Sequence, residues 1–376
     1  MVKKMKNKKK NQIKFNIFSF ISTFARSLIE IFISLYLFKN GFNIRSILLF
    51  YLFENFFALF LSYIFVIIGE KYKYSIVMYI GIFSFIVLQI ILNNITNSIS
   101  YIFLIALLYS IYRRGYWVSR RFYITNIMPQ KNTSEIFSIL MIVSELSSIF
   151  AGYVGAFLLD DLNMLTLTII SSVLLFISVI PLIKINYKST NTKIELIKHL
   201  KTYDKRNYIA FSLYELNNLL SFIFPIYIAI NIQNSYVLAG SINAISNIAI
   251  IVFIIIYGKL IKKKNYFFIS SLLFIIISIT KLFLLNYFIL VIYFIEGIIK
   301  KMQNQSVNKI YFENRNGMDP THYNLIYQII ESFIRSIVVI PLLFMNNIEY
   351  MIIFVLIIIG IELFIYKCFK KDKKLN

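Results

Sequence analysis

The chain has 376 residues, of which 59% are apolar and only 15% are charged, and its formal net charge at pH 7 is +22. This apolar share exceeds the roughly 45–50% of ordinary soluble domains, whereas disordered chains are poorer in apolar residues and richer in charge. Composition therefore excludes a soluble globular protein and a disordered one. It predicts an all-α integral membrane protein with little room for a domain outside the bilayer.

Twelve apolar runs follow one another along the chain, and each is long enough to cross a membrane as a helix. They cover residues 15–38, 46–68, 74–92, 99–127, 134–159, 162–183, 208–230, 236–258, 266–285, 287–308, 323–345 and 348–368. The first run follows a lysine-rich start that imitates a signal peptide, but it is too long and lacks a small-residue cleavage site. We therefore expect it to remain as the first of twelve transmembrane helices.

Basic residues in the connections predict the orientation, because Lys and Arg stay on the cytoplasmic side of a membrane. With a cytoplasmic N-terminus, the connections on that side carry most of the 39 Lys and Arg residues, whereas Lys39, Arg45 and Lys281 lie on the opposite side. Both termini are therefore expected in the cytoplasm, with the protein in the cytoplasmic membrane. This topology and a preference for Lys over Arg account for the positive charge without nucleic-acid binding.

The longest connection, residues 184–207, is basic and polar, and it divides the chain into two six-helix bundles, residues 1–183 and 208–376. The two bundles carry similar features at similar places. Glu145 lies in the fifth run and Glu331 lies in the eleventh, which is the corresponding run of the second bundle. Paired bundles of this kind are typical of transporters that bind a solute between them.

A short motif follows the second run, where residues 69–73 read Gly-Glu-Lys-Tyr-Lys. It resembles a degraded form of the glycine–acidic–basic loop motif of the major facilitator superfamily, with Glu70 in place of the usual Asp and without the second glycine. Pro129, just before the fifth run, also resembles that family's passage from its fourth to its fifth helix. Together with the six-plus-six arrangement, these features make the whole chain similar to this family. The resemblance implies a secondary transporter that works by alternating access.

Charged residues inside apolar runs are the candidate functional residues, because each costs about 2.5–3.5 kcal/mol at the centre of a membrane helix unless it meets water or a partner. The fourth run holds the densest group, Arg113, Arg114, Trp117, Arg120 and Arg121, which share one helix face. Guanidinium groups bind carboxylates and phosphates through paired nitrogens. We interpret Arg113, Arg114, Trp117 and Arg120 as substrate-binding residues. The alternative is that Arg120 and Arg121 reach the cytoplasmic headgroups.

Further substrate-binding candidates lie in other runs of the two bundles, namely Arg26, Asn243, Asn247, Lys300 and Lys301. Lys300 and Lys301 begin a polar face on the tenth run, and with the arginines of the fourth run they predict a cavity that attracts an anionic or zwitterionic solute. Asn243 and Asn247 serve either as cavity lining or as hydrogen-bonding residues between helices.

Carboxylates inside the apolar runs are the candidates for proton coupling, and we single out Glu30, Glu145, Glu215 and Glu331. Arg26 stands four residues before Glu30, and Arg335 four residues after Glu331, so both couples predict local ion pairs. Glu145 and Glu215 lack a cation on their own helix, and burial favours the protonated form of an unpaired carboxyl group. These two are the preferred proton sites. The alternative for each is an ion pair with an arginine of another helix.

No catalytic, metal or cofactor site is expected, because His199, His322 and Cys368 lie far apart in the sequence and the aspartates lie in or beside connections. A polytopic membrane enzyme, a membrane scaffold and a lipid flippase remain as alternatives. The prediction is a secondary active transporter for a small solute, with the proton as coupling ion, that works as a monomer in the lipid bilayer.

Overall fold

The computed structural model describes residues 2–127, 133–182, 205–232, 235–257, 266–313 and 320–372. Within these residues the regular structure is helical. The elements are α1 (Val2–Glu30), α2 (Ile33–Lys39), α3 (Ile44–Lys71), α4 (Tyr74–Leu92), α5 (Ile99–Ile127), α6 (Thr133–Asp161), α7 (Met164–Val179), the 3-10 turn η1 (Ile180–Leu182), α9 (Lys205–Asn231), α10 (Tyr236–Tyr257), α11 (Phe267–Glu313), α12 (Pro320–Leu342) and α13 (Ile348–Asp372). The described residues of each apolar run lie mainly in one or two of these elements.

Capping side chains explain where two of these helices begin. The Asn43 side chain accepts a hydrogen bond from the Ser46 backbone N–H at 2.8 Å at the start of α3, and Asn163 does the same for Thr166 at the start of α7. Such caps satisfy backbone donors that the first helical turn leaves free. Short polar sequences between apolar runs therefore fix the helix boundaries.

Helix α11 contains the ninth and tenth runs and folds back on itself at Phe288, whose backbone angles (φ −132°, ψ 32°) are not helical. Gln303 donates a hydrogen bond to the hydroxyl of Ser271 at 3.1 Å, although the two residues are 32 positions apart. A straight helix would separate them by about 48 Å. The two legs of α11 therefore lie side by side, as two separate helices of the bundle.

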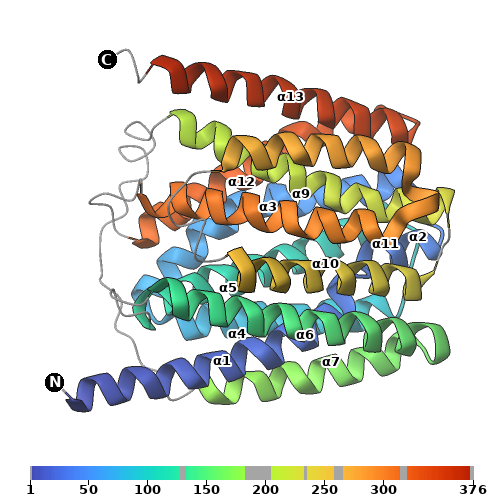
Figure 1. The fold of residues 1–376 in the computed structure, drawn as a ribbon. Coiled ribbons are helices and arrows are strands. Elements are labelled where there is room, and N and C mark those ends of the chain that lie inside the picture. Colours follow the sequence, from blue (N-terminus) through green and yellow to red (C-terminus); the bar gives the residue numbers. More distant parts are fainter. Residues whose placement is uncertain are drawn as a thin grey trace.

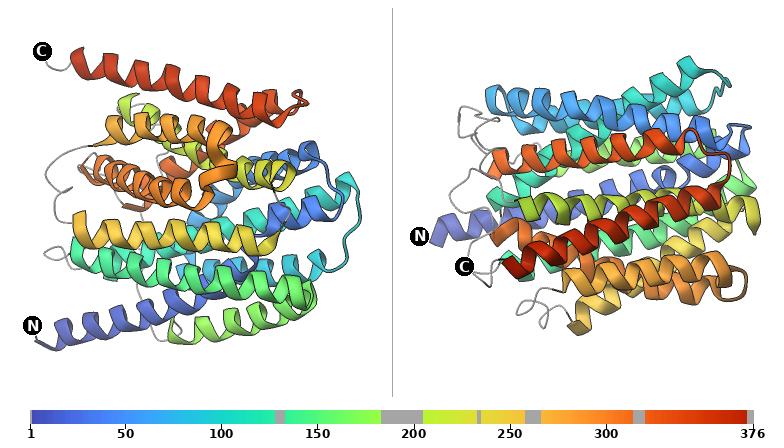
Figure 2. Two further views of the ribbon diagram at one scale, coloured as in Figure 1. Left: turned by 45° about the vertical axis from the view of Figure 1, so that its right-hand side comes forward. Right: turned by 90° about the horizontal axis from the view of Figure 1, so that it is seen from above.

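Ten helical segments of the described residues are long and apolar enough to cross a membrane. The fourth and tenth runs, in α5 and the second leg of α11, are not among the ten because their basic residues lower the mean hydropathy. The helices run roughly parallel to one direction, and α1 begins at the same end of the bundle at which α13 finishes (Figures 1 and 2). The count of twelve crossings and the cytoplasmic side of the termini stay predictions.

The orientation is testable through Cys368, which is exposed near the end of α13 and is the only cysteine of the chain. If the C-terminus is cytoplasmic, a membrane-impermeant maleimide should label Cys368 in inside-out vesicles and leave it unlabelled in right-side-out vesicles. Labelling can be measured by a gel shift after denaturation. The reverse pattern would place both termini on the outer side.

The helix contacts have the pattern that two related bundles require. Between the halves, α3 packs on α12 and α6 packs on α10, and exchanging the two halves converts one pair into the other. Within the halves, α1 packs on α6 and α7 in the way that α9 packs on α12 and α13. A two-fold repeat predicts these equivalences. The division at residues 183 and 208 remains a prediction, since most of the connection 184–207 lies outside the described residues.

The contact between α6 and α10 depends on glycine. A Cβ atom added to Gly240 would lie 2.5 Å from the carbonyl oxygen of Gly152, and one added to Gly152 would lie 3.2 Å from the carbonyl oxygen of Gly240. Asn243 of α10 donates hydrogen bonds across the same contact to the carbonyl oxygen and the hydroxyl of Ser148, at 3.3 and 3.4 Å. Small residues thus let the two halves approach closely and share polar contacts.

Candidate functional site

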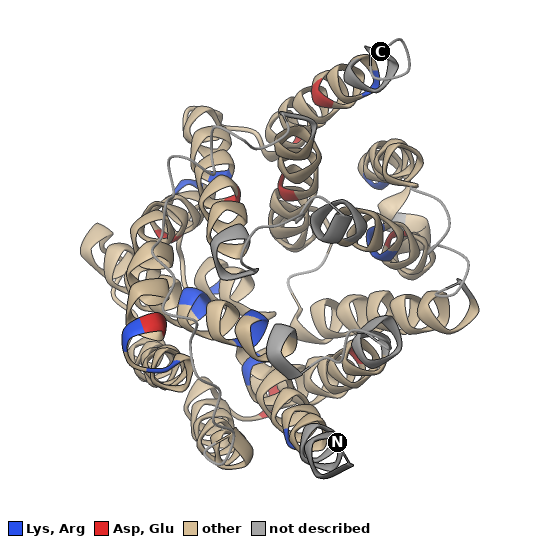
Figure 3. Ribbon diagram, turned by 90° about the vertical axis from the view of Figure 1, so that its left-hand side faces the viewer, with Lys and Arg blue, Asp and Glu red and all other residues tan. Residues whose placement is uncertain are grey.

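A cavity of about 910 Å³ lies between the two halves, lined by α1, α2, α3, α5 and α6 on one side and by α9, α11 and α12 on the other. Its charged lining residues are Arg26, Glu30, Arg113, Arg114, Arg120, Arg121, Glu145, Glu215, Glu331 and Arg335. Figure 3 looks along the bundle and shows charged positions on helices of both halves. Six arginines against four glutamates give the described lining an excess of positive charge.

Helix α5 presents its basic face to this cavity. The helical spacing places Arg113, Arg114, Trp117, Arg120 and Arg121 on one face, and all five line the cavity. Arg114 is 2% exposed and Arg120 is 7% exposed. These side chains therefore lie inside the protein, and the alternative in which Arg120 extends to the lipid headgroups does not describe this structure.

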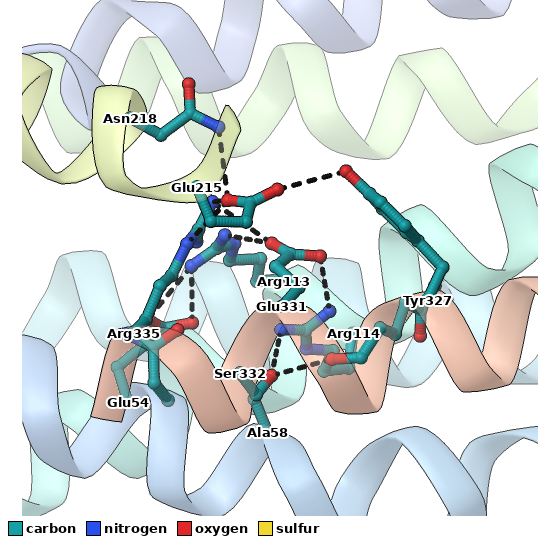
Figure 4. Close-up of polar contacts among 12 residues, drawn as sticks. Glu54, Ala58, Arg113, Arg114, Glu215, Asn218, Tyr327, Glu331, Ser332 and Arg335 are labelled. Atoms are coloured by element: carbon teal, nitrogen blue, oxygen red, sulfur yellow. Dashed lines mark hydrogen bonds and ion pairs between the residues drawn. The ribbon is translucent and has the colours of Figure 1, made fainter. Parts of the chain in front are cut away.

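The arginines at the start of this face form a network with glutamates of two other helices. Arg113 donates to both carboxylate oxygens of Glu54 on α3, at 2.8 and 2.9 Å, and to Oε1 of Glu331 on α12, at 2.7 Å. Arg114 donates to the other oxygen of Glu331 at 3.3 Å and to the hydroxyl of Ser332 (Figure 4). The Glu331 carboxylate thus joins α12 to two consecutive arginines of the opposite half.

The network continues within the second half. Arg335 contacts Glu331 at 3.1 Å and donates through Nε to Oε2 of Glu215 on α9 at 2.8 Å, with a second contact from Nη2. Glu215 also accepts hydrogen bonds from Tyr327 and Asn218, at 3.0 and 3.1 Å (Figure 4). The prediction of a local ion pair between Glu331 and Arg335 is confirmed, and Glu215 has the partner on another helix that the alternative described.

We call this set the central ion network, and its members are Glu54, Arg113, Arg114, Glu215, Glu331 and Arg335. It holds three arginines and three glutamates, so it is neutral as a unit. Buried ions are tolerated when they are paired and hydrogen-bonded in this way. Glu54 and Glu331 together occupy the Arg113 guanidinium.

A second group surrounds Trp117, farther along the same face of α5. The guanidinium carbons of Arg26 and Arg120 lie 5.1 and 5.0 Å from the centre of the Trp117 ring, which is the range of cation–π attraction. Arg26 donates to Glu30 at 2.9 Å, so this predicted local ion pair is confirmed. Arg120 donates to the hydroxyl of Ser144 at 3.3 Å. We call Arg26, Glu30, Trp117 and Arg120 the tryptophan cluster.

Glu145 on α6 lines the cavity beside the tryptophan cluster and makes no hydrogen bond or ion pair with the described residues. Lys301 on α11 is 4% exposed and likewise lacks such a partner in the described part of the chain. Their charges attract each other, and the charge of Glu145 also acts on Arg26 and Arg120. Glu145 thus has no direct ion pair in the described residues. Its carboxylate is attracted only over longer distances by cations of other helices.

Other predicted substrate-binding residues lie away from the cavity lining. Lys300 pairs with Glu296 at 3.2 Å, and Asn243 bonds to α6 as described above. Asn247 is buried, and its amide nitrogen has no partner in the described residues. From the same polar face as Lys300 and Lys301, Asn304 and Asn308 line the cavity instead.

Lys281 requires a correction, because the charge count assigned it to the connections on the side opposite the cytoplasm. In the structure it is fully buried in the first leg of α11, where it pairs with Glu296 of the second leg at 2.7 Å. Its ammonium group also lies over the rings of Phe224 and Tyr293, at 4.2 and 3.9 Å from their centres. The pairing with Glu296 explains how a lysine is accommodated inside an apolar hairpin.

Among the described residues, no three His, Cys, Asp or Glu side chains come together as a metal site. His199 lies outside these residues, and so does the Pro129 motif. The side chain of Cys368 is free and exposed.

Comparison with known proteins places this cavity in context. The sequence matches the family description "Major Facilitator Superfamily" over residues 15–329, so the chain belongs to this family of membrane transporters. The crystal structure of a mutant of the nucleoside transporter NupG has a similar fold, with a TM-score of 0.67, 15% sequence identity, and coverage of 95% of this chain and 99% of that chain. No curated protein matches the sequence. The chain is therefore a secondary transporter and not the polytopic membrane enzyme that the sequence left as an alternative.

Proposed function

We propose that this transporter moves a small anionic or zwitterionic solute across the cytoplasmic membrane, as a monomer and by alternating access. One observation carries the proposal: the cavity between the halves is lined by six arginines and four glutamates. A cation would meet net repulsion there, whereas an anion or the acidic end of a zwitterion would be attracted.

The arrangement of the halves supports alternating access. The cavity receives side chains from both halves, and the two halves meet through the equivalent helix pairs α3 with α12 and α6 with α10. Rocking of one bundle against the other about a central site is the movement that paired bundles permit. A solute bound between the halves then reaches one side of the membrane or the other.

We further propose that a proton is the coupling ion. Glu30, Glu215 and Glu331 each form an ion pair with an arginine. Glu145 lines the same cavity without an ion pair in the described residues, so it is the first candidate for the proton site, and Glu215 at the junction of α9 and α12 is the second.

Transport by the purified protein in proteoliposomes tests the proposal. Labelled organic acids, amino acids, amines and nucleosides should be offered with and without a pH gradient. Nucleosides form the neutral comparison, because the name of the structurally similar transporter includes them. We expect uptake or exchange of acidic or zwitterionic solutes, accelerated by the pH gradient.

The Glu145→Gln and Glu215→Gln variants test the coupling. The variant at the proton site should lose acceleration by the pH gradient and keep solute exchange, since exchange needs no net proton movement. Transport of cations or neutral compounds alone would contradict the proposed substrate class. Full proton-driven transport by both variants would contradict the two assigned sites, and lipid movement without solute transport would favour the flippase alternative.

A further inference from the structure

We propose that Arg120 and Trp117 form an oxyanion subsite in the cavity, and that protonation of Glu145 strengthens binding of the anion there. This inference rests on the proposed function and deepens it, because it names the chemical group that is bound and links its binding to a proton. Its ligand is a small solute with one carboxylate or phosphate group.

Arg120 is a buried cation of the cavity lining whose guanidinium has no carboxylate partner in the described residues. It is only 7% exposed, its Nε atom has no partner in the described residues, and its closest polar contact there is a 3.3 Å hydrogen bond to the neutral hydroxyl of Ser144. By contrast, Arg113, Arg114 and Arg335 are all bonded to glutamates. A buried guanidinium without a carboxylate is costly unless water or a bound anion serves as its partner.

The surroundings of Arg120 suit an oxyanion. Trp117 holds the guanidinium group from one side through cation–π attraction, which leaves the nitrogen atoms available for oxygen acceptors. Arg26 contacts the same ring and is already balanced by Glu30. One guanidinium therefore remains for one acidic group, and this matches a monoanion better than a multiply charged solute.

Glu145 controls the charge that this anion meets. The charged groups around it are contributed by three helices, whereas the sequences of the packed helices α7 and α10 contain no Asp, Glu, Lys or Arg. The charges that act on Glu145 are those of Arg26 from α1, Arg120 from α5 and Lys301 from α11, while Glu30 and Arg121 line the same cavity.

Arg26 pairs with Glu30, and Arg121 lies over the ring of Tyr327 at 4.7 Å, which leaves Glu145 to offset Arg120 and Lys301. The ionised Glu145 carboxylate offsets one of these two positive charges. Protonation removes the negative charge of Glu145. A bound anion is then attracted by the positive charges of Arg120 and Lys301 and is no longer repelled by the carboxylate. Proton and anion therefore bind better together than either binds alone.

The experiment uses Trp117 as the reporter, because it is the only tryptophan of the chain. The purified full-length protein is excited where tyrosine does not absorb, and fluorescence is quenched with iodide, an anionic probe, or with acrylamide, a neutral one. Iodide quenching of the wild type should rise as the pH is lowered. Acetate and inorganic phosphate, compared with chloride at equal ionic strength, then show which oxyanion competes for the subsite.

The variants separate the roles of the residues. Arg120→Gln should lower the iodide quenching constant on the order of tenfold, as is typical of coupled ligand sites, and leave acrylamide quenching unchanged. In Glu145→Gln, iodide should quench the Trp117 fluorescence as strongly at high pH as at low pH, because glutamine imitates the protonated carboxyl group. Arg45→Gln removes an exposed positive charge that bonds to Asn346 elsewhere, and it should behave as the wild type.

Unchanged iodide quenching in Arg120→Gln, or the same pH dependence in Glu145→Gln and wild type, overturns the subsite. The outcome is separate from that of the transport assay. If the protein transports anions but iodide quenches Arg120→Gln as strongly as the wild type, the proposed function is retained and the subsite is rejected. A subsite that follows all three expectations, in a protein that transports only cations, would reject the proposed function alone.

Discussion

Replacing Glu331 with glutamine is expected to abolish transport and to lower the free energy of unfolding by about 3–5 kcal/mol, the usual cost of removing one partner from a buried ion pair. The Glu331 carboxylate accepts hydrogen bonds from Arg113 and Arg114 and contacts Arg335. Glutamine has nearly the same shape, but it leaves the three guanidinium groups with two carboxylates. Thermal unfolding in detergent and transport in proteoliposomes measure the two effects.

Two further variants make the result interpretable. Glu349→Gln removes an exposed carboxylate at the start of α13 and should change neither quantity by a measurable amount. Combining Glu331→Gln with Arg114→Gln restores equal numbers of positive and negative charges in the central ion network, so the double variant should recover part of the lost stability. If Glu331→Gln is as stable as the wild type, the network does not stabilise the fold.

Substituting leucine for Gly240 should also abolish transport, through shape instead of charge. A side chain at this position meets the backbone of Gly152, whose carbonyl oxygen would lie 2.5 Å from the new Cβ atom, so α10 must move away from α6. Overpacking of this kind typically costs about 1–3 kcal/mol. The same displacement breaks the hydrogen bonds of Asn243 to Ser148 between the halves. Crosslinking of cysteines introduced in α6 and α10 measures the separation.

Gly360 on α13 provides the matched control, because a Cβ atom there meets nothing within 4 Å. Gly360→Ala should retain transport and gain a few tenths of a kcal/mol up to about 1 kcal/mol of stability, since alanine favours the helix. Normal transport by Gly240→Leu would mean that the α6 and α10 contact is not needed during the transport cycle.

Much of the architecture could be predicted from the sequence, because membrane helices must be apolar along their whole length. The twelve runs therefore corresponded to helices. The face formed by Arg113, Trp117 and Arg120 was also predictable, since the helical repeat places residues four and seven apart on one side. That these residues line a cavity agrees with the cost of leaving arginine in lipid.

Pairing between helices could not be predicted in the same way. Arg113 and Glu54 are 59 residues apart, and Arg113 and Glu331 are 218 apart, so no local spacing connects them. Lys281 was misplaced because counting charges by side assumes that lysines of apolar runs lie near an end. Its partner Glu296 lies on the second leg of α11, and only the reversal at Phe288 brings the two together.

The division of the central ion network between the halves has a consequence for movement. Glu54, Arg113 and Arg114 belong to the first half, whereas Glu215, Glu331 and Arg335 belong to the second. The network is neutral only while the halves touch at this point. Any motion that parts α5 from α12 leaves one surplus positive charge on the first half and one surplus negative charge on the second. The two separated surfaces must then bind water, a proton or the two ends of a zwitterion. The free energy of hydrating or neutralising these opposite charges therefore contributes to the barrier between the conformations.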